Sequence, residues 1–92
     1  MNKAELVDRV SSAANISKKE SSEVVDALFE SIQEALAQGE KVQIVGFGTF
    51  EVRQRAARTG RNPQTGEPMD IAARQVPVFK PGKSLKDAVT NG

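Results

Sequence analysis

Residues 53–74 read RQRAARTGRNPQTGEPMDIAAR, and this stretch decides how the rest of the chain is interpreted. It contains five arginines and almost no side chain large enough to fill a core. A domain of 92 residues can seldom leave about a quarter of its length unpacked. The stretch is therefore either a disordered insert or an arm that folds around an acidic partner.

The middle of the stretch, GRNPQTG at residues 60–66, carries the Asn-Pro and Gly signals of a chain reversal. We expect a hairpin centred on Gln64, in which residues i and 128 − i face each other. This register places oppositely charged residues across from one another, which favours an ordered ribbon over a disordered insert. The expected charge pairs are Arg58 with Asp70 and Arg61 with Glu67.

The same register predicts how the base of the hairpin is packed. It places Phe50 opposite Val78 and Val52 opposite Val76 on one face, with Phe47 and Phe79 on the other. Because both faces are then apolar near the base, one pair of helices cannot cover them, and we expect a second copy of the chain to do so.

The arginines of the arm do not fall on one face by simple alternation. Arg53 and Arg55 share a face, whereas Arg58 lies on the other if the strand is regular. We therefore expect a bulge or a sharp twist around Ala56-Ala57, and a straight ladder would contradict this.

Outward from the arm, the sequence predicts two further strands, at about 42–45 and 75–80, which flank a strand at 49–53. Residues 46–48 (GFG) are interpreted as a tight turn, since neither the Lys-Ser/Thr nor the helix of a phosphate-binding loop follows. Pro77 has no N–H and must lie where the ladder does not need one. A short helix is expected at 84–90.

The first 40 residues predict two helices, at about 3–14 and 18–38. Asn2 and Ser17 each precede a glutamate by three residues, the spacing of a helix N-cap, and Asn15 and Gly39 end the helices. The second helix is acidic beyond Lys19, so it is not a reader of a phosphate-lined groove.

Composition narrows the class of function. Residues 1–40 have a net charge of −4 and residues 41–92 a net charge of +5, which favours a scaffold half and a polyanion-binding half. The chain has no cysteine and no histidine, so we expect no metal, no cofactor and no enzyme activity. It also lacks an apolar run long enough for a membrane span and a signal-peptide core, so we expect a soluble, intracellular protein.

The segment GFGTFEVRQRAARTGRNPQTG at residues 46–66 closely resembles the signature of bacterial histone-like DNA-binding proteins, the HU/IHF family. The opening MNKAELVDRV and the later VPVFKPGKSLKDAV are similar to the same family, so the resemblance covers essentially the whole chain. It implies an α+β fold: an intertwined homodimer with an N-terminal helical hairpin, a three-stranded antiparallel sheet extended into a β-ribbon arm, and a short C-terminal helix. One domain (1–92) is expected, divided into a dimerisation body (1–40), a sheet (41–81) with the arm (53–76), and the last helix (82–92).

The resemblance also implies a function, which is largely non-specific binding and bending of double-stranded DNA from the minor groove, in the bacterial nucleoid. Pro63 at the tip is the expected wedge between base steps, beside Asn62. The expected phosphate and groove contacts are Arg53, Arg55, Arg58, Arg61 and Arg74 on the arm, and Lys3, Lys80, Lys83 and Lys86 on the body.

Two alternative functions remain open, and the sequence departs from the family pattern at two positions. The same motif is compatible with a sequence-preferring IHF-type bender, and the same charges with a module that binds structured RNA. Thr59 and Gln75 stand where relatives often carry lysine. The resemblance thus implies up to four fewer charges per dimer and a shallower salt dependence, by about 0.9 per lost phosphate contact.

Overall fold

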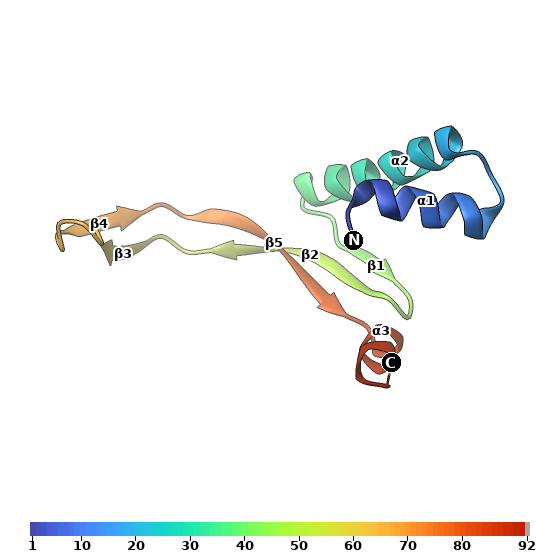
Figure 1. Ribbon diagram of the computed structural model, residues 1–92. Helices are drawn as coiled ribbons and strands as arrows, with labels where there is room; N and C mark the ends of the chain where they lie inside the picture. Colours follow the sequence, from blue (N-terminus) through green and yellow to red (C-terminus); the bar gives the residue numbers. More distant parts are fainter. Residues whose placement is uncertain (92) are drawn as a thin grey trace. The chain divides into compact units, whose positions relative to one another are not determined.

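The computed structural model describes residues 1–91, which form three helices and five strands (Figure 1). They divide into two compact units near the end of the second helix, one covering Met1–Ala35 and the other beginning at Leu36. None of the described helices is long and apolar enough to cross a membrane. The expected single domain, with its internal boundaries, stays a prediction.

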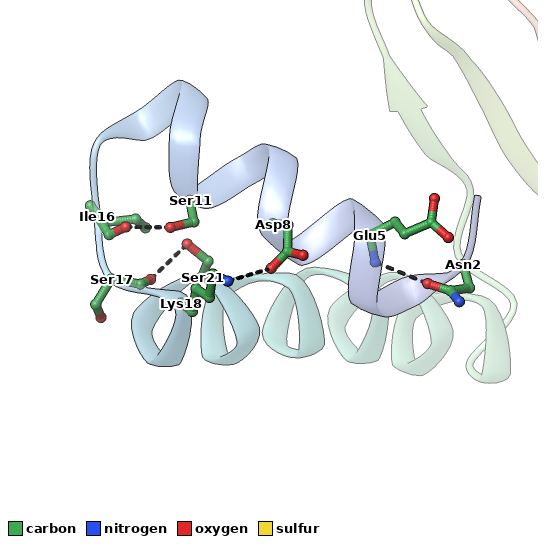
Figure 2. A network of polar contacts seen from close by, with 8 residues as sticks. All are labelled: Asn2, Glu5, Asp8, Ser11, Ile16, Ser17, Lys18 and Ser21. Atoms are coloured by element: carbon green, nitrogen blue, oxygen red, sulfur yellow. Dashed lines mark hydrogen bonds and ion pairs between the residues drawn. The ribbon is translucent and has the colours of Figure 1, made fainter.

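The helical unit consists of α1 (Lys3–Ala14) and most of α2 (Lys18–Ala37). Their starts are capped as the sequence predicted. Asn2 Oδ1 accepts the N–H of Glu5 at 2.9 Å (Figure 2). Ser17 Oγ accepts the N–H of Glu20 at 3.0 Å. Asn15 adopts the left-handed conformation (φ 57°) that ends α1. These local signals explain why the sequence places the helix limits to within a residue.

The turn between the helices is held by serine hydroxyls. Ser11 donates to the carbonyl of Ile16 at 2.7 Å, and Ser21 donates to that of Ser17 at 2.8 Å (Figure 2). Val7 and Val25 are the only hydrophobic side chains that the described part of the chain buries. Val24, Leu28 and Phe29 of α2 are about half exposed, which leaves this unit with uncovered apolar surface.

The second unit is built on a three-stranded antiparallel sheet in the order β1-β2-β5, formed by Val42–Ile44, Gly48–Arg55 and Arg74–Pro81. The β2–β5 pair continues into a two-stranded ribbon of β3 (Arg58–Arg61) and β4 (Pro68–Ile71), so the stretch at 53–74 is a hairpin arm (Figure 1). Because β5 is an edge strand of this sheet, the sheet can accommodate Pro77, as predicted.

The register of the hairpin differs from the prediction by one residue. Paired residue numbers add up to 129 throughout, as in Phe50 with Phe79 and Val52 with Pro77, where 128 was expected. The reason lies in the tip, because the loop Pro63-Gln64-Thr65-Gly66 has four residues and its centre falls between Gln64 and Thr65. The expected pairing of Phe50 with Val78 and of Val52 with Val76 is therefore wrong.

The corrected register gathers the aromatic side chains on one face. Phe79 lies on the same face as Phe50, with ring centroids 4.7 Å apart, and not on the opposite face as expected. Phe47, from the turn before β2, lies 5.6 Å from Phe79. Gly48 is needed here, because a Cβ at this position would meet the Phe79 ring at 2.6 Å.

The final helix, α3 (Lys83–Asn91), is attached to the turn between β1 and β2. The N–H of Gly82 donates to the carbonyl of Phe47 at 2.7 Å, and that of Leu85 donates to the carbonyl of Gly46 at 3.2 Å. The lysines at the start of α3 are therefore fixed relative to the sheet, within the same unit as the arm.

Candidate nucleic-acid interface

The register places the basic residues of β2 and β5 on the face opposite the aromatic cluster. Directly paired residues share a face, so Arg53, Arg55 and Arg74 lie together, and Arg55 is paired directly with Arg74. Lys80, paired with Thr49, lies on the same face nearer the turn. We call this surface, made by Arg53, Arg55, Arg74 and Lys80, the basic face.

Toward the tip of the arm, the basic face ends where the pairing of the two strands is interrupted. Ala56-Ala57 and Ala72-Ala73 are unpaired, and the register is unchanged beyond them. Equal numbers of residues on the two strands exclude a one-residue bulge, so that form of the prediction is wrong, whereas the sharp twist stays a prediction. An open hollow of about 420 Å³ lies at this point and is lined in part by Arg53, Arg55, Arg58 and Arg74.

Beyond the interruption the expected charge pairs do not form. Arg58 is paired with Ile71, Arg61 with Pro68, and Asp70 with Thr59, because the register differs by one residue. Among the described residues Arg58 has no carboxylate within salt-bridge distance, and neither has Arg55 or Arg74. These arm guanidinium groups are therefore not neutralised by the protein itself.

The tip loop is ordered by its own hydrogen bonds. The N–H of Asn62 donates to the carbonyl of Glu67 at 2.8 Å, and the N–H of Gly66 donates to that of Asn62 at 2.7 Å. Asn62 Oδ1 also accepts the N–H of Gln64 at 2.9 Å, and Arg61 Nη1 donates to the carbonyl of Gly66 at 3.0 Å. Arg61 and Asn62 thus support the loop that contains the exposed Pro63.

Of the four lysines expected to contact DNA, three form ion pairs. Lys3 of α1 pairs with Asp26 of α2 in the helical unit, Lys83 lies 3.7 Å from Asp87 within α3, and Lys80 lies 2.9 Å from Glu51. Lys86 is exposed on α3. Lys80, Lys83 and Lys86 belong to the same unit as the arm, whereas Lys3 belongs to the other.

Glu51 is the residue that the sequence reasoning did not single out. Its carboxylate contacts Lys80 Nζ at 2.9 Å and Arg53 Nε at 3.7 Å, in the middle of the basic face. The hydrogen bond from Lys80, with the charges of Lys80, Lys41 and Arg53, lowers the pKa of Glu51 despite partial desolvation. Its alternation with Arg53 and Arg55 was the available signal, since residues two apart share a strand face.

Comparison with known proteins identifies the family. The family model described as "Bacterial DNA-binding protein" matches residues 1–90. The chain is 63% identical over 89 residues to the DNA-binding protein HU of Geobacillus stearothermophilus and, equally, to that of Staphylococcus aureus. Each match covers 97% of this chain and 99% of the relative.

Solved structures agree with this result. The Anabaena HU–DNA cocrystal structure matches with a TM-score of 0.93 and 49% identity, covering all of both chains. HU from Thermotoga maritima matches with a TM-score of 0.70 and 46% identity, over 97% of this chain and 98% of that one. The chain therefore belongs to the bacterial DNA-binding protein family that includes HU.

Proposed function

We propose that this protein binds double-stranded DNA with little sequence preference and bends it, holding the minor groove with its β-ribbon arms and thereby organising the bacterial chromosome in the nucleoid. The relatives named above are DNA-binding proteins, and one of them is described in a cocrystal with DNA.

The observation that carries the proposal is the direct pairing of Arg55 with Arg74. Like charges directly across a sheet destabilise it, and no described carboxylate lies within salt-bridge distance of either residue. A phosphate between the two guanidinium groups removes this repulsion and gains charge-assisted hydrogen bonds. The basic face is thus suited to a polyanion such as the phosphate backbone, and contacts to phosphates carry no sequence information.

Bending is assigned to the tip. Pro63 presents a rigid apolar ring on a loop that is held by backbone and side-chain hydrogen bonds. Apolar wedges inserted between base steps in the minor groove, alongside arginine, unstack the bases and kink the duplex. HU and IHF are themselves among the proteins known to bend DNA in this way, so the wedge is carried over from the family and applied to Pro63.

A homodimer is the second part of the proposal. Each unit of the single chain leaves apolar side chains uncovered: Leu28 and Phe29 in the helical unit, and Val45 and Phe47 in the sheet unit. A chain of this size with two buried hydrophobic side chains in its described part has too small a core to be stable alone. A second copy that covers these surfaces supplies the missing burial and brings two arms to one duplex.

Salt-dependent titration tests the polyanion claim. Wild type and an Arg55→Gln/Arg74→Gln protein are titrated with random-sequence duplex DNA, the same duplex with a nick, and double-stranded RNA of equal length. We expect wild type to prefer DNA, and nicked DNA most, because a nick lowers the cost of bending. The double variant should have a logarithmic salt slope shallower by up to about 1.8, at about 0.9 for each of the two phosphates that the dimer no longer neutralises.

The matched control is Arg9→Gln/Lys19→Gln, which removes two positive charges from the helices and should leave the slope close to that of wild type. Equal or tighter binding of RNA would replace DNA bending by RNA binding as the function. A large preference for one defined duplex over random duplex would instead indicate a sequence-preferring bender.

The cross-strand partners of Thr59 and Gln75 predict which of the two positions affects DNA binding more. Thr59 is paired with Asp70, so a lysine there meets a carboxylate across the ribbon, whereas Gln75 is paired with the neutral Gln54. We therefore expect Gln75→Lys to steepen the salt slope of DNA binding by more than Thr59→Lys does, up to about 0.9 per chain. Filter-binding isotherms over a salt series measure both slopes, and a larger effect from Thr59→Lys would contradict the expected order of the two variants.

A further inference from the structure

Glu51 is the only carboxylate among the residues that share the basic face of β2 and β5. Its side chain is 17% exposed, whereas those of its two partners, Lys80 and Arg53, are 55% and 56% exposed. The Glu51 side chain is therefore less exposed to solvent than either of the two cations that pair with it. Two of the four cations of the basic face are bound to Glu51, and the other two, Arg55 and Arg74, are not.

The ion pairs determine how much free energy each cation gains by contacting a phosphate. Arg55 and Arg74 gain a partner when a phosphate arrives, whereas Lys80 and Arg53 must exchange the Glu51 carboxylate for the phosphate. At Lys80 the exchange replaces one charge-assisted hydrogen bond with another, and at Arg53 it gives up an ion pair of 3.7 Å. It also leaves the partly buried Glu51 without its cationic partners, which carries a desolvation cost. The net gain at Lys80 and Arg53 is accordingly small.

We propose that Glu51 is a positioning residue that limits DNA affinity, because it holds Lys80 and Arg53 away from phosphates and leaves Arg55 and Arg74 as the main phosphate contacts of the arm base. This inference rests on the proposed DNA binding. In the unbound protein the same carboxylate pairs with both Lys80 and Arg53 and offsets their positive charges. Glu51 thus stabilises the base of the free arm and weakens DNA binding.

A double-mutant cycle on the full-length protein tests the proposal. Wild type, Glu51→Gln, Lys80→Gln and the double variant are titrated with random-sequence duplex DNA from low to moderate salt. We expect Glu51→Gln to bind severalfold more tightly at low salt, with a slope steeper by about 0.9 for each released cation that reaches a phosphate. Lys80→Gln should change the slope little in the wild-type background and by up to about 1.8 per dimer in the Glu51→Gln background.

The matched control is Glu40→Gln, which makes the same chemical change at an exposed glutamate outside the sheet and should alter the slope little. The proposal would be overturned if the salt slope of Glu51→Gln were no steeper than that of wild type. It would also be overturned if Lys80→Gln changed the slope equally in the wild-type and Glu51→Gln backgrounds. If circular dichroism shows that Glu51→Gln does not fold, Lys80→Gln and Arg74→Gln are compared in the otherwise wild-type protein. A decrease in salt slope as large for Lys80→Gln as for Arg74→Gln would overturn the proposal, and a much smaller decrease would support it. Absence of salt-dependent DNA binding by wild type would instead reject the proposed function itself.

Discussion

A Pro63→Ala protein is expected to bend DNA less than wild type while its salt-dependent binding to duplex DNA is largely retained. Wedge insertion by proteins of this kind kinks a duplex by roughly 20–90°, so loss of the wedge removes a large part of the bend. The phosphate contacts assigned to Arg55 and Arg74 lie at the arm base and are untouched by the substitution. Binding and bending should therefore separate in this variant.

The loop geometry indicates that Pro63→Ala removes the proline ring without disturbing the loop. None of the hydrogen bonds that hold the tip involves the Pro63 ring. They use backbone groups of Asn62, Gln64, Gly66 and Glu67 and the side chains of Arg61, Asn62 and Thr65. The left-handed residue of the loop is Gly66 (φ 73°), which the substitution leaves in place. Alanine therefore removes the rigid apolar ring and keeps the loop that presents it.

Fluorescence energy transfer between the ends of a labelled duplex measures the bend and the lifetime of the bent state. Pro68→Ala is the matched control: it removes a proline from the same arm at the first residue of β4, outside the tip loop and paired with Arg61. We expect Pro68→Ala to bend DNA as wild type does. Bending by Pro63→Ala equal to that of wild type would remove the wedge from the mechanism.

The helices could be predicted almost to the residue because their limits depend on local chemistry. Asn2, Ser17 and Asn15 act within their own turn of helix, and the hydrogen bonds found are those that the spacing indicated. The existence of the arm was equally predictable, since a stretch without core residues and with Asn-Pro and Gly at its centre has few other ways to fold.

The register could not be predicted, because turn composition indicates a reversal without fixing the number of loop residues. A loop centred on one residue and a loop of four residues differ by one position in every cross-strand pair, and this changes which side chains share a face. The four-residue loop found here pairs Arg55 with Arg74 and moves Phe79 beside Phe50. Both the basic face and the aromatic cluster therefore depend on a feature that the sequence left undetermined.

The role of Glu51 was hidden for a related reason. Alternation along β2 places Glu51 on the same face as Arg53, but Lys80 comes from β5 and reaches Glu51 only in the correct register. A sequence pattern within one strand indicates which residues share a face, whereas contacts across strands require the pairing.

Leu28→Glu is expected to dissociate the proposed dimer. Leu28 is 52% exposed on α2 in the single chain, beside the half-exposed Phe29, and a closed two-fold interface contains each side chain twice. Full burial of a leucine is worth about 1.5–3 kcal/mol, and only about half of this side chain remains to be buried at the interface. The loss is therefore about 1.5–3 kcal/mol per dimer, and the introduced charge adds to this. The dimer dissociation constant should rise by at least about 10-fold.

Sedimentation equilibrium at micromolar concentration measures this change, with circular dichroism on the same samples. Ala27→Glu is the matched control, because Ala27 is exposed on the side of α2 away from Leu28 and Phe29 and receives the same charge. Since the single chain buries so little, we expect Leu28→Glu to lose helical signal as it dissociates and to lose DNA binding with it. A wild-type protein that sediments as a stable monomer, or a Leu28→Glu protein that remains dimeric, would contradict the proposed assembly, and the uncovered side chains of α2 would then need another partner.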